Sequence, residues 1–250
     1  MKVRIKFSKQ GEMRFIGHLD LMRFFQKVIR RSGTDIRYSE GMSPHMIMSF
    51  ASPLGVGLTS DGEYVDIEVN SWTGREDLLE RLNASSVPEI RFLDAVPVPE
   101  GREDKAMSMV AAASYNVSFR EGKEPSCCWK ERVGPFLAQD VIEIEKISKK
   151  AAKKAEMKTR RYGKKMADPG TFIRKINIRP LIYRMDLSGQ CISMLVSSGS
   201  EVNLRPEEVL AAFGAFIGET VAFSDLQINR TDLYARDREN ELSFIPLNKV

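Results

Sequence analysis

The order of apolar patterns in the first hundred residues restricts the fold of this 250-residue chain more than any other feature. Val3, Ile5 and Phe7 alternate with charged residues, as in a half-buried strand, and residues 19–31 have the periodicity of an amphipathic helix. A capping box at residues 73–76 is expected to begin a second helix. Three further strands are predicted at residues 45–50, 64–69 and 90–96. Strand, helix, strand, strand, helix, strand is the order of a ferredoxin-like, or split βαβ, domain.

The second half of the chain repeats this order with one strand too many. Its clearest element is a helix from Pro206 to Ile217, with acids in the first turn and Gly218 beyond its end. Strands are expected at residues 115–119, 141–147 and 221–228, and a hairpin joins 173–185 to 191–197 through a loop at 186–190.

These patterns predict an α+β protein with tandem ferredoxin-like domains and antiparallel sheets. We expect an N-terminal domain over residues 1–98, a linker over 99–113, and a C-terminal domain over 114–250 with a basic insertion at 146–170. Helices in such a domain cover one face of the sheet, so the other face is expected to be free.

Composition excludes several classes of protein. Three cysteines, with no Cys-x-x-Cys pair, cannot build a disulfide framework, and they offer neither a structural zinc site nor an iron–sulfur cluster. We therefore expect a cytoplasmic protein with no metal or cofactor of its own. No apolar run approaches the roughly 18 residues that cross a bilayer, so no membrane association is predicted.

Charge is concentrated in one segment. Residues 146–165 contain ten Lys or Arg and one acid, a formal charge of +9, so the remainder of the chain is −5 against the total of +4. Tyr162 lies between two basic pairs, and such interleaving favours RNA, because bases stack on aromatic rings beside phosphate contacts. A soluble loop without a specific partner is the alternative interpretation. The phosphate-binding residues predicted here are Arg160, Arg161, Tyr162, Lys164, Lys165, Arg174 and Arg179.

The first predicted helix carries a second basic feature. Arg23, Lys27 and Arg31 recur every four residues, with Arg30 beside them, so they form one basic stripe. Guanidinium groups hold phosphate oxygens bidentately, which makes this stripe a candidate phosphate site. A solvated helix face is the alternative.

The only two histidines are His18 and His45. His18 is placed where a strand leads into a helix, and the free N–H groups of a helix start can hold a phosphate. With Asp20 and His45 it could position RNA, and a catalytic His18 would suit a metal-independent ribonuclease, because imidazole titrates near neutrality. The alternative is that both imidazoles serve the fold.

Six motifs occur in one order along the chain. They are Arg14-Phe-Ile-Gly-His-Leu-Asp20, Ser39-Glu-Gly-Met-Ser-Pro-His45, Ser49-Phe-Ala-Ser-Pro-Leu54, Asn177-Ile-Arg-Pro180, Asn203-Leu-Arg-Pro206 and Arg230-Thr-Asp-Leu-Tyr234. These family-like motifs resemble a bacterial family called radical SAM-linked proteins, a domain of unknown function found alone or fused behind a radical SAM protein. This chain has a longer basic stretch where the family usually has a short Lys-Lys-Gly turn. The likeness implies a radical SAM partner, which carries the iron–sulfur cluster and SAM. A looser likeness of fold is to the RNA-processing proteins associated with CRISPR repeats.

Our leading hypothesis is a non-enzymatic module that binds tRNA or rRNA and presents it to a separate radical SAM enzyme for modification. A ribonuclease that uses His18 is one alternative. A protein–protein scaffold, which docks its partner on a free sheet face and binds no RNA, is the other.

Overall fold

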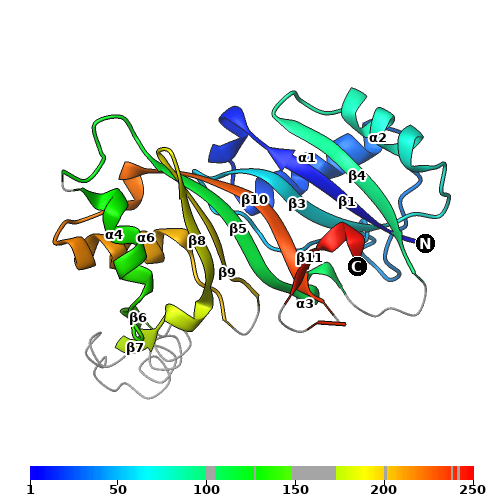
Figure 1. Cartoon of the computed structure of the whole chain (residues 1–250). Helices are drawn as coiled ribbons and strands as arrows, with labels where there is room; N and C mark the ends of the chain where they lie inside the picture. Colours follow the sequence, from blue (N-terminus) through cyan, green and yellow to red (C-terminus); the bar gives the residue numbers. More distant parts are fainter. Residues whose placement is uncertain (100–104, 127, 148–172, 200–201, 238, 241–242) are drawn as a thin grey trace, which may run out of the picture.

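One mixed β-sheet runs through both halves of the chain (Figure 1). The computed structural model describes residues 1–99, 105–126, 128–147, 173–199, 202–237, 239–240 and 243–250. Its strands follow the order β4-β1-β3-β10-β5-β9-β8, with β2 paired to β3 and β11 paired to β10. The α+β class is therefore confirmed.

The first half contains the elements that the sequence predicts. Strand β1 is antiparallel to both β3 and β4, and β2 is antiparallel to β3. Helix α1 buries Leu21, Phe25, Val28 and Ile29, which lie three or four residues apart and therefore share one face. The elements are β1 (Lys2–Lys9), η1 (Gly11–Phe15), α1 (His18–Arg31), β2 (Met48–Phe50), β3 (Thr59–Glu68), α2 (Arg75–Ala84) and β4 (Ile90–Val98).

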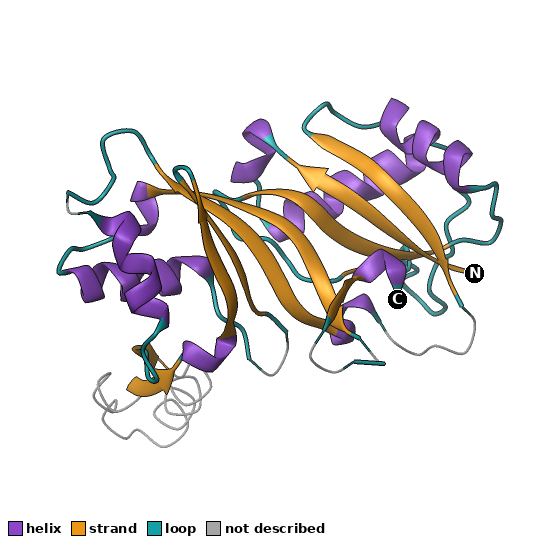
Figure 2. Ribbon diagram, viewed as in Figure 1, coloured by secondary structure: helices purple, strands orange, loops and turns teal. Residues whose placement is uncertain are grey.

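In the second half, β10, β5, β9 and β8 are antiparallel neighbours, while β6 and β7 form a separate two-stranded sheet. Helices α4 and α6 lie at the opposite end of the molecule from α1 and α2 (Figure 2). The elements are α3 (Ala106–Met109), β5 (Val110–Phe119), α4 (Trp129–Leu137), β6 (Glu143–Ile147), β7 (Ile173–Asn177), η3 (Arg179–Leu181), β8 (Ile182–Ser188), β9 (Cys191–Ser197), α6 (Pro206–Ile217), η4 (Phe223–Asp225), β10 (Leu226–Arg236), β11 (Phe244–Pro246) and η5 (Leu247–Lys249).

Three sequence-based details are wrong. The predicted strand 173–185 is divided, because β7 pairs with β6 and only β8 pairs with β9, across a two-residue turn at 189–190. The last long strand begins at Leu226 rather than 221 and continues to Arg236. No capping box forms at Thr73, because the N-cap of α2 is the next residue, Gly74.

The two halves meet where β3 lies parallel to β10, and we call this boundary the seam. Only two residue pairs are in register there, Asn229 with Thr59 and Arg230 with Ser60. Beyond them, a Cβ on Gly62 would lie 2.6 Å from the carbonyl oxygen of Thr231. Only glycine allows the two backbones to approach so closely.

Side chains supply the remaining bonds across the seam. Arg230 donates to Glu63 from Nε at 2.7 Å and also from Nη2, and both residues are buried. On the other face of the sheet, Asp232 accepts from Tyr64 at 2.7 Å and from Lys6 at 2.6 Å. Charged and polar groups therefore join the halves on both faces.

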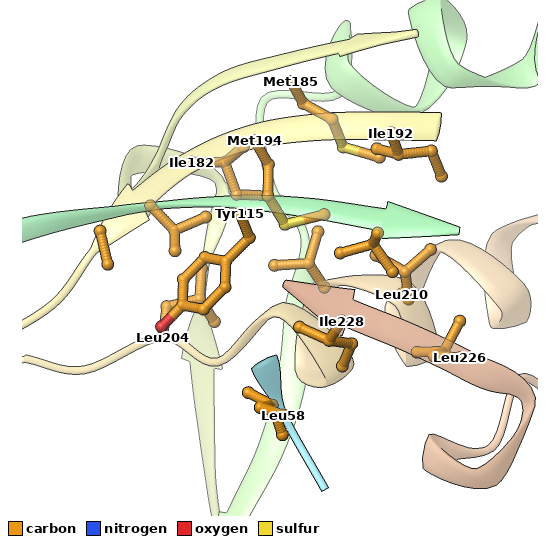
Figure 3. Packing of buried hydrophobic residues seen from close by; sticks show 14 of the residues in the cluster. Leu58, Tyr115, Ile182, Met185, Ile192, Met194, Leu204, Leu210, Leu226 and Ile228 are labelled. Carbon is orange, nitrogen blue, oxygen red and sulfur yellow. The ribbon is translucent and has the colours of Figure 1, made fainter. Parts of the chain in front are cut away.

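Two hydrophobic cores pack the helices against the sheet. The first packs α1 and α2 against Val3, Ile5, Phe7, Val65 and Ile67. The second packs α4 and α6 against β5, β8, β9 and β10, and it also takes in Leu54 and Leu58 from the first half and extends to Tyr64 and Leu247 on the other face. Figure 3 shows Leu58 among the residues packed around Tyr115 and Ile228.

The second face of the first-half sheet is not free, contrary to expectation. Arg4 on that face donates to the Leu247 carbonyl at 3.0 Å, and Tyr64 donates to Asn248 at 3.1 Å. The end of the chain thus packs on the first half (Figure 1). In the second half, Asn116 and Gln227 remain exposed on this face. No described helix is long and apolar enough to span a membrane.

Replacing Glu63 by Gln tests the seam. The substitution leaves the buried Arg230 guanidinium without its counter-charge, so we expect the free energy of unfolding to fall by about 3 kcal/mol. Urea denaturation measures the change. Glu68→Gln is the control, because its Arg37 partner is half exposed, and it should cost below about 1 kcal/mol. Equal losses in the two variants would contradict a special role for the buried pair.

Candidate functional site

Three family-like motifs come together beside the seam. The Gly57 N–H donates to the Arg14 carbonyl at 2.8 Å. The His18 ring meets the Phe50 ring edge-on, with centroids 5.3 Å apart. Arg230 donates to the Ser52 carbonyl at 2.7 Å. The motifs that begin at Arg14, Ser49 and Arg230 therefore form one region, although more than two hundred residues separate the first from the last.

Buried charged groups lie beneath this region. Glu63 alternates with Val65 and Ile67 of the first core, and Arg230 alternates with Ile228 and Leu226 of the second. Because alternate residues share a face, the Glu63–Arg230 pair lies on the side that both helix layers cover. The Tyr115 side chain is hydrogen-bonded to the Arg230 guanidinium. We call Lys9, Glu63, Tyr115 and Arg230 the seam cluster.

Lys9 is the unusual member of the seam cluster. Its side chain is only 1% exposed, and its Nζ donates to the Ile16 carbonyl at 3.1 Å. Within the described residues no carboxylate lies within 4.0 Å of this ammonium, so it is buried without a direct ion pair. Burial lowers the pKa of Lys9 below its usual 10.5, against the attraction of Glu63, and the charge of Arg230 lowers it further.

His18 is the first residue of α1. The N-cap, Gly17, has no side chain to bond the free N–H groups of the first turn. The His18 Nδ1 is buried and has no hydrogen-bond partner among the described residues. The uncapped N–H groups suit binding of an acceptor group at this helix start, whereas the Nδ1 atom is enclosed by the protein and is not open to a ligand. Asp20 lies in the same turn and is exposed.

The structure does not join the two histidines. His45 is exposed, and its Nδ1 lies 2.8 Å from the Ser39 hydroxyl. It lines a cavity of about 310 Å³ with Lys2 and Glu68. No hydrogen bond or ring contact connects His45 to His18, so neither provides a second acid or base for the other.

The basic stripe of α1 is exposed, as predicted for a binding surface and equally for a solvated face. Arg23 pairs with Asp20 at 3.1 Å, and both side chains are about two-thirds exposed. Arg31 donates from Nε to the Lys27 carbonyl at 3.3 Å. Lys27 and Arg30 make no ion pair with any described residue.

The basic insertion is largely outside the described residues, including Arg160, Arg161, Tyr162, Lys164 and Lys165. At its described edges, Arg174 is exposed on β7, and Lys175 lies 3.6 Å from Glu143 of the paired strand. Arg179 differs from the other predicted phosphate ligands. Its guanidinium donates to the carbonyls of Leu137 at 2.7 Å and Ile182 at 3.2 Å, so these contacts tie α4 to β8.

Sequence reasoning did not find the seam cluster. The period-2 pattern did carry a signal, because Lys9 continues the series Val3, Ile5 and Phe7, and Glu63 precedes Val65 at the same two-residue spacing. Alternation therefore places both charged residues on the inward face, but it does not show which partner each one meets there. Arg230 was available as a signal, because it begins a family-like motif. Among the described residues no group of three His, Cys, Asp or Glu side chains could hold a metal ion.

Lys9→Met tests the buried ammonium. The pKa of Lys9 is lower in the folded state than in the unfolded state. Below the folded-state pKa, charged Lys9 therefore destabilises the fold to its full extent. Between the folded-state pKa and 10.5, the stability of the protein rises with pH. We expect Lys9→Met to be at least as stable as the wild type at pH 7, with its advantage shrinking as the pH rises towards 10.5. Urea denaturation across this range measures it. A less stable variant at pH 7 would show that attraction to Glu63 outweighs burial.

Comparison with known proteins identifies a family. No curated protein matches the chain. Among solved structures it is similar to a chain of a Cbf5-Nop10-Gar1 complex, with 10% identity, 92% of this chain covered and a TM-score of 0.45. This chain spans about half of that one, 48%, and so low a TM-score carries no argument. Residues 2–173 match a family described as "Uncharacterized protein conserved in bacteria". The chain therefore belongs to this bacterial family, DUF2344.

Proposed function

We propose that this protein is an RNA-binding module that presents RNA, such as tRNA or rRNA, to a separate modifying enzyme. The observation that carries the proposal is the exposed stripe of Arg23, Lys27, Arg30 and Arg31 on α1. Three of these cations, Lys27, Arg30 and Arg31, have no described ion-pair partner, and the Asp20–Arg23 pair is so exposed that it holds Arg23 only weakly. The stripe therefore offers charge that the fold does not use.

Charge elsewhere in the chain supports an anionic partner. The segment 146–165 carries +9 while the remainder is −5, so the positive charge is not spread for solubility. Arg174 extends this charge onto β7, where its strand neighbour is Lys146. Lysine and arginine side chains that neutralise RNA phosphates displace the counter-ions held by the RNA. This release makes the affinity for RNA fall as the salt concentration rises.

The proposal includes a finer description of the fold. The first half connects its strands as β1-α1-β2-β3-α2-β4 in the spatial order β4-β1-β3-β2. The second half has the equivalent order β10-β5-β9-β8, with α4 and α6 in the helix positions and the β6–β7 pair inserted. We regard these as two ferredoxin-like units that share one sheet, with antiparallel pairing inside each unit and parallel pairing between them.

The partner in this proposal comes from the family resemblance. A radical SAM protein would carry the iron–sulfur cluster and SAM, and this chain would bind the RNA in the cytoplasm. Of the described cysteines, Cys128 is exposed and immediately precedes α4, and Cys191 begins β9.

The two alternatives have less support. A ribonuclease that uses His18 needs a second acid or base, and among the described residues none contacts its ring. A scaffold that docks on a free sheet face loses much of that face to the end of the chain, which covers the first half.

Reversing two charges of the stripe tests RNA binding. Lys27→Glu with Arg30→Glu should weaken binding to a short RNA at least tenfold at low salt. Each lost phosphate contact should also make the slope of log K against log salt shallower by about 0.7 for a single strand. Fluorescence anisotropy with a labelled RNA, repeated at several salt concentrations, measures both quantities.

The matched control reverses two exposed helix cations at the far end of the molecule, Lys130 and Arg132 of α4. It changes the net charge equally and should leave affinity within about threefold of the wild type. Equal losses in both double variants would mean that only net charge matters. A wild-type protein that binds no RNA at low salt would refute the proposed function.

A further inference from the structure

Four large apolar side chains are exposed beside the seam. They are Phe15 at 55%, Leu19 at 62%, Val56 at 55% and Phe223 at 47%. Phe15 belongs to η1, Leu19 to the first turn of α1, Val56 to the loop before β3, and Phe223 to η4. Burying these groups in the core would have been favourable, so their exposure from four separate elements calls for an explanation. We call them the seam patch.

Gly57 connects three members of the seam patch, Phe15, Val56 and Phe223. Its N–H donates to the carbonyl of Arg14, the residue before Phe15. A Cβ on Gly57 would lie 3.5 Å from Cζ of Phe223, so the loop that carries Val56 passes against that ring. Gly57 has φ +90°, a conformation that suits glycine. The loop thus bridges η1 of the first half and η4 of the second.

Cations surround the apolar groups. The Arg14 guanidinium lies over the Phe15 ring, 4.7 Å from its centroid. Arg120 is exposed and donates to the Ser224 carbonyl beside Phe223 at 3.0 Å, and Lys123 lies 4.0 Å from Asp225. On α1, Leu19 precedes Arg23 and Lys27 at four-residue spacing, so the patch and the stripe are continuous along one helix face.

We infer that the seam patch is a stacking platform for the unpaired bases of single-stranded RNA, with Phe15 and Phe223 as the stacking residues. The inference rests on the proposed function and names the form of RNA that the site takes. Exposed aromatic rings accept the faces of any base, and neighbouring cations hold the backbone. In a duplex the base faces are stacked on one another and cannot reach such a platform.

An apolar protein surface is the competing occupant. The rim decides between the two, because Arg14 and Arg120, which have no described carboxylate partner, place positive charge beside the two rings. Phosphates match that charge, whereas an apolar protein face would have to leave it without a partner. We therefore assign the patch to RNA, and docking of a partner protein is one outcome of the experiment.

Phe15→Leu with Phe223→Leu separates the two occupants. Leucine preserves apolar surface and removes the aromatic face, so single-stranded RNA should bind about tenfold more weakly or worse. Phe15→Tyr with Phe223→Tyr keeps the rings and should bind within about threefold of the wild type. Duplex RNA should bind the wild type and both variants alike. Anisotropy with a ten-nucleotide strand and its duplex measures these affinities, and thermal unfolding checks that the exposed substitutions leave the fold intact.

The outcomes distinguish failure of this inference from failure of the proposed function on which it rests. If the wild type binds neither RNA, both fail. If it binds RNA and the leucine variant binds the single strand equally well, the platform is refuted and RNA binding by the stripe stands. A third result would overturn the inference and assign the patch to protein docking. In that result the leucine variant still binds single-stranded RNA, and a Phe15→Asp and Phe223→Asp variant no longer associates with a purified radical SAM protein.

Discussion

The guanidinium of Arg230 and the carboxylate of Glu63 lie buried between the two helix layers, where β3 and β10 meet. Backbone pairing at this seam covers only two residue pairs, so it cannot by itself fix how the halves lie. Removing two charges from water is costly, and only close, bidentate geometry with further hydrogen bonds offsets that cost. Arg230 meets this condition, because its guanidinium donates both to the Glu63 carboxylate and to the Ser52 carbonyl.

This requirement organises the surrounding chain. Arg230 fixes the 50–57 loop through Ser52, and the loop reaches η1 through Gly57 and lies against η4 through Phe223. Lys9 on the neighbouring strand is held beneath η1 by the Ile16 carbonyl. The exposed rings of Phe15 and Phe223 therefore keep their positions because a charge pair beneath them is satisfied. A surface that spans two halves of a chain needs such an anchor, since neither half alone presents both rings.

The sequence predicts local elements well and their assembly poorly. Helix α1 follows from apolar residues three and four apart, and α6 follows from Pro206, two acids and Gly218, whose φ is +81°. The continuous sheet does not follow, because the β3–β10 pairing depends on residues about 170 positions apart. Strand alternation reveals only part of the site. It places Lys9 and Glu63 on the same faces as the apolar residues of their strands, but their partners, Ile16 and Arg230, follow only from the tertiary structure.

The predicted binding residues divide in the same way. The α1 stripe could be derived from spacing alone, because four-residue intervals place Arg23, Lys27 and Arg31 on one face whatever surrounds the helix. Arg179 could not be distinguished from them, since its role depends on two carbonyls in distant elements. Phe15 lies in a family-like motif, but the sequence did not show that either Phe15 or Phe223 is exposed, because an exposed aromatic residue looks like a core residue there.

Helix α1 carries part of both surfaces, the seam patch and the basic stripe. Its first turn carries Leu19 of the seam patch, and the following turns carry Arg23 and Lys27 of the stripe. Attraction between the stripe and phosphates falls as salt rises, whereas stacking on exposed rings involves no counter-ion release. In the proposed function, the stripe controls how strongly salt weakens RNA binding, while the seam patch controls the preference for unpaired bases. Because the two contributions come from different interactions, on α1 for the stripe and on η1 and η4 for the stacking rings, a change in strand preference need not alter the salt dependence.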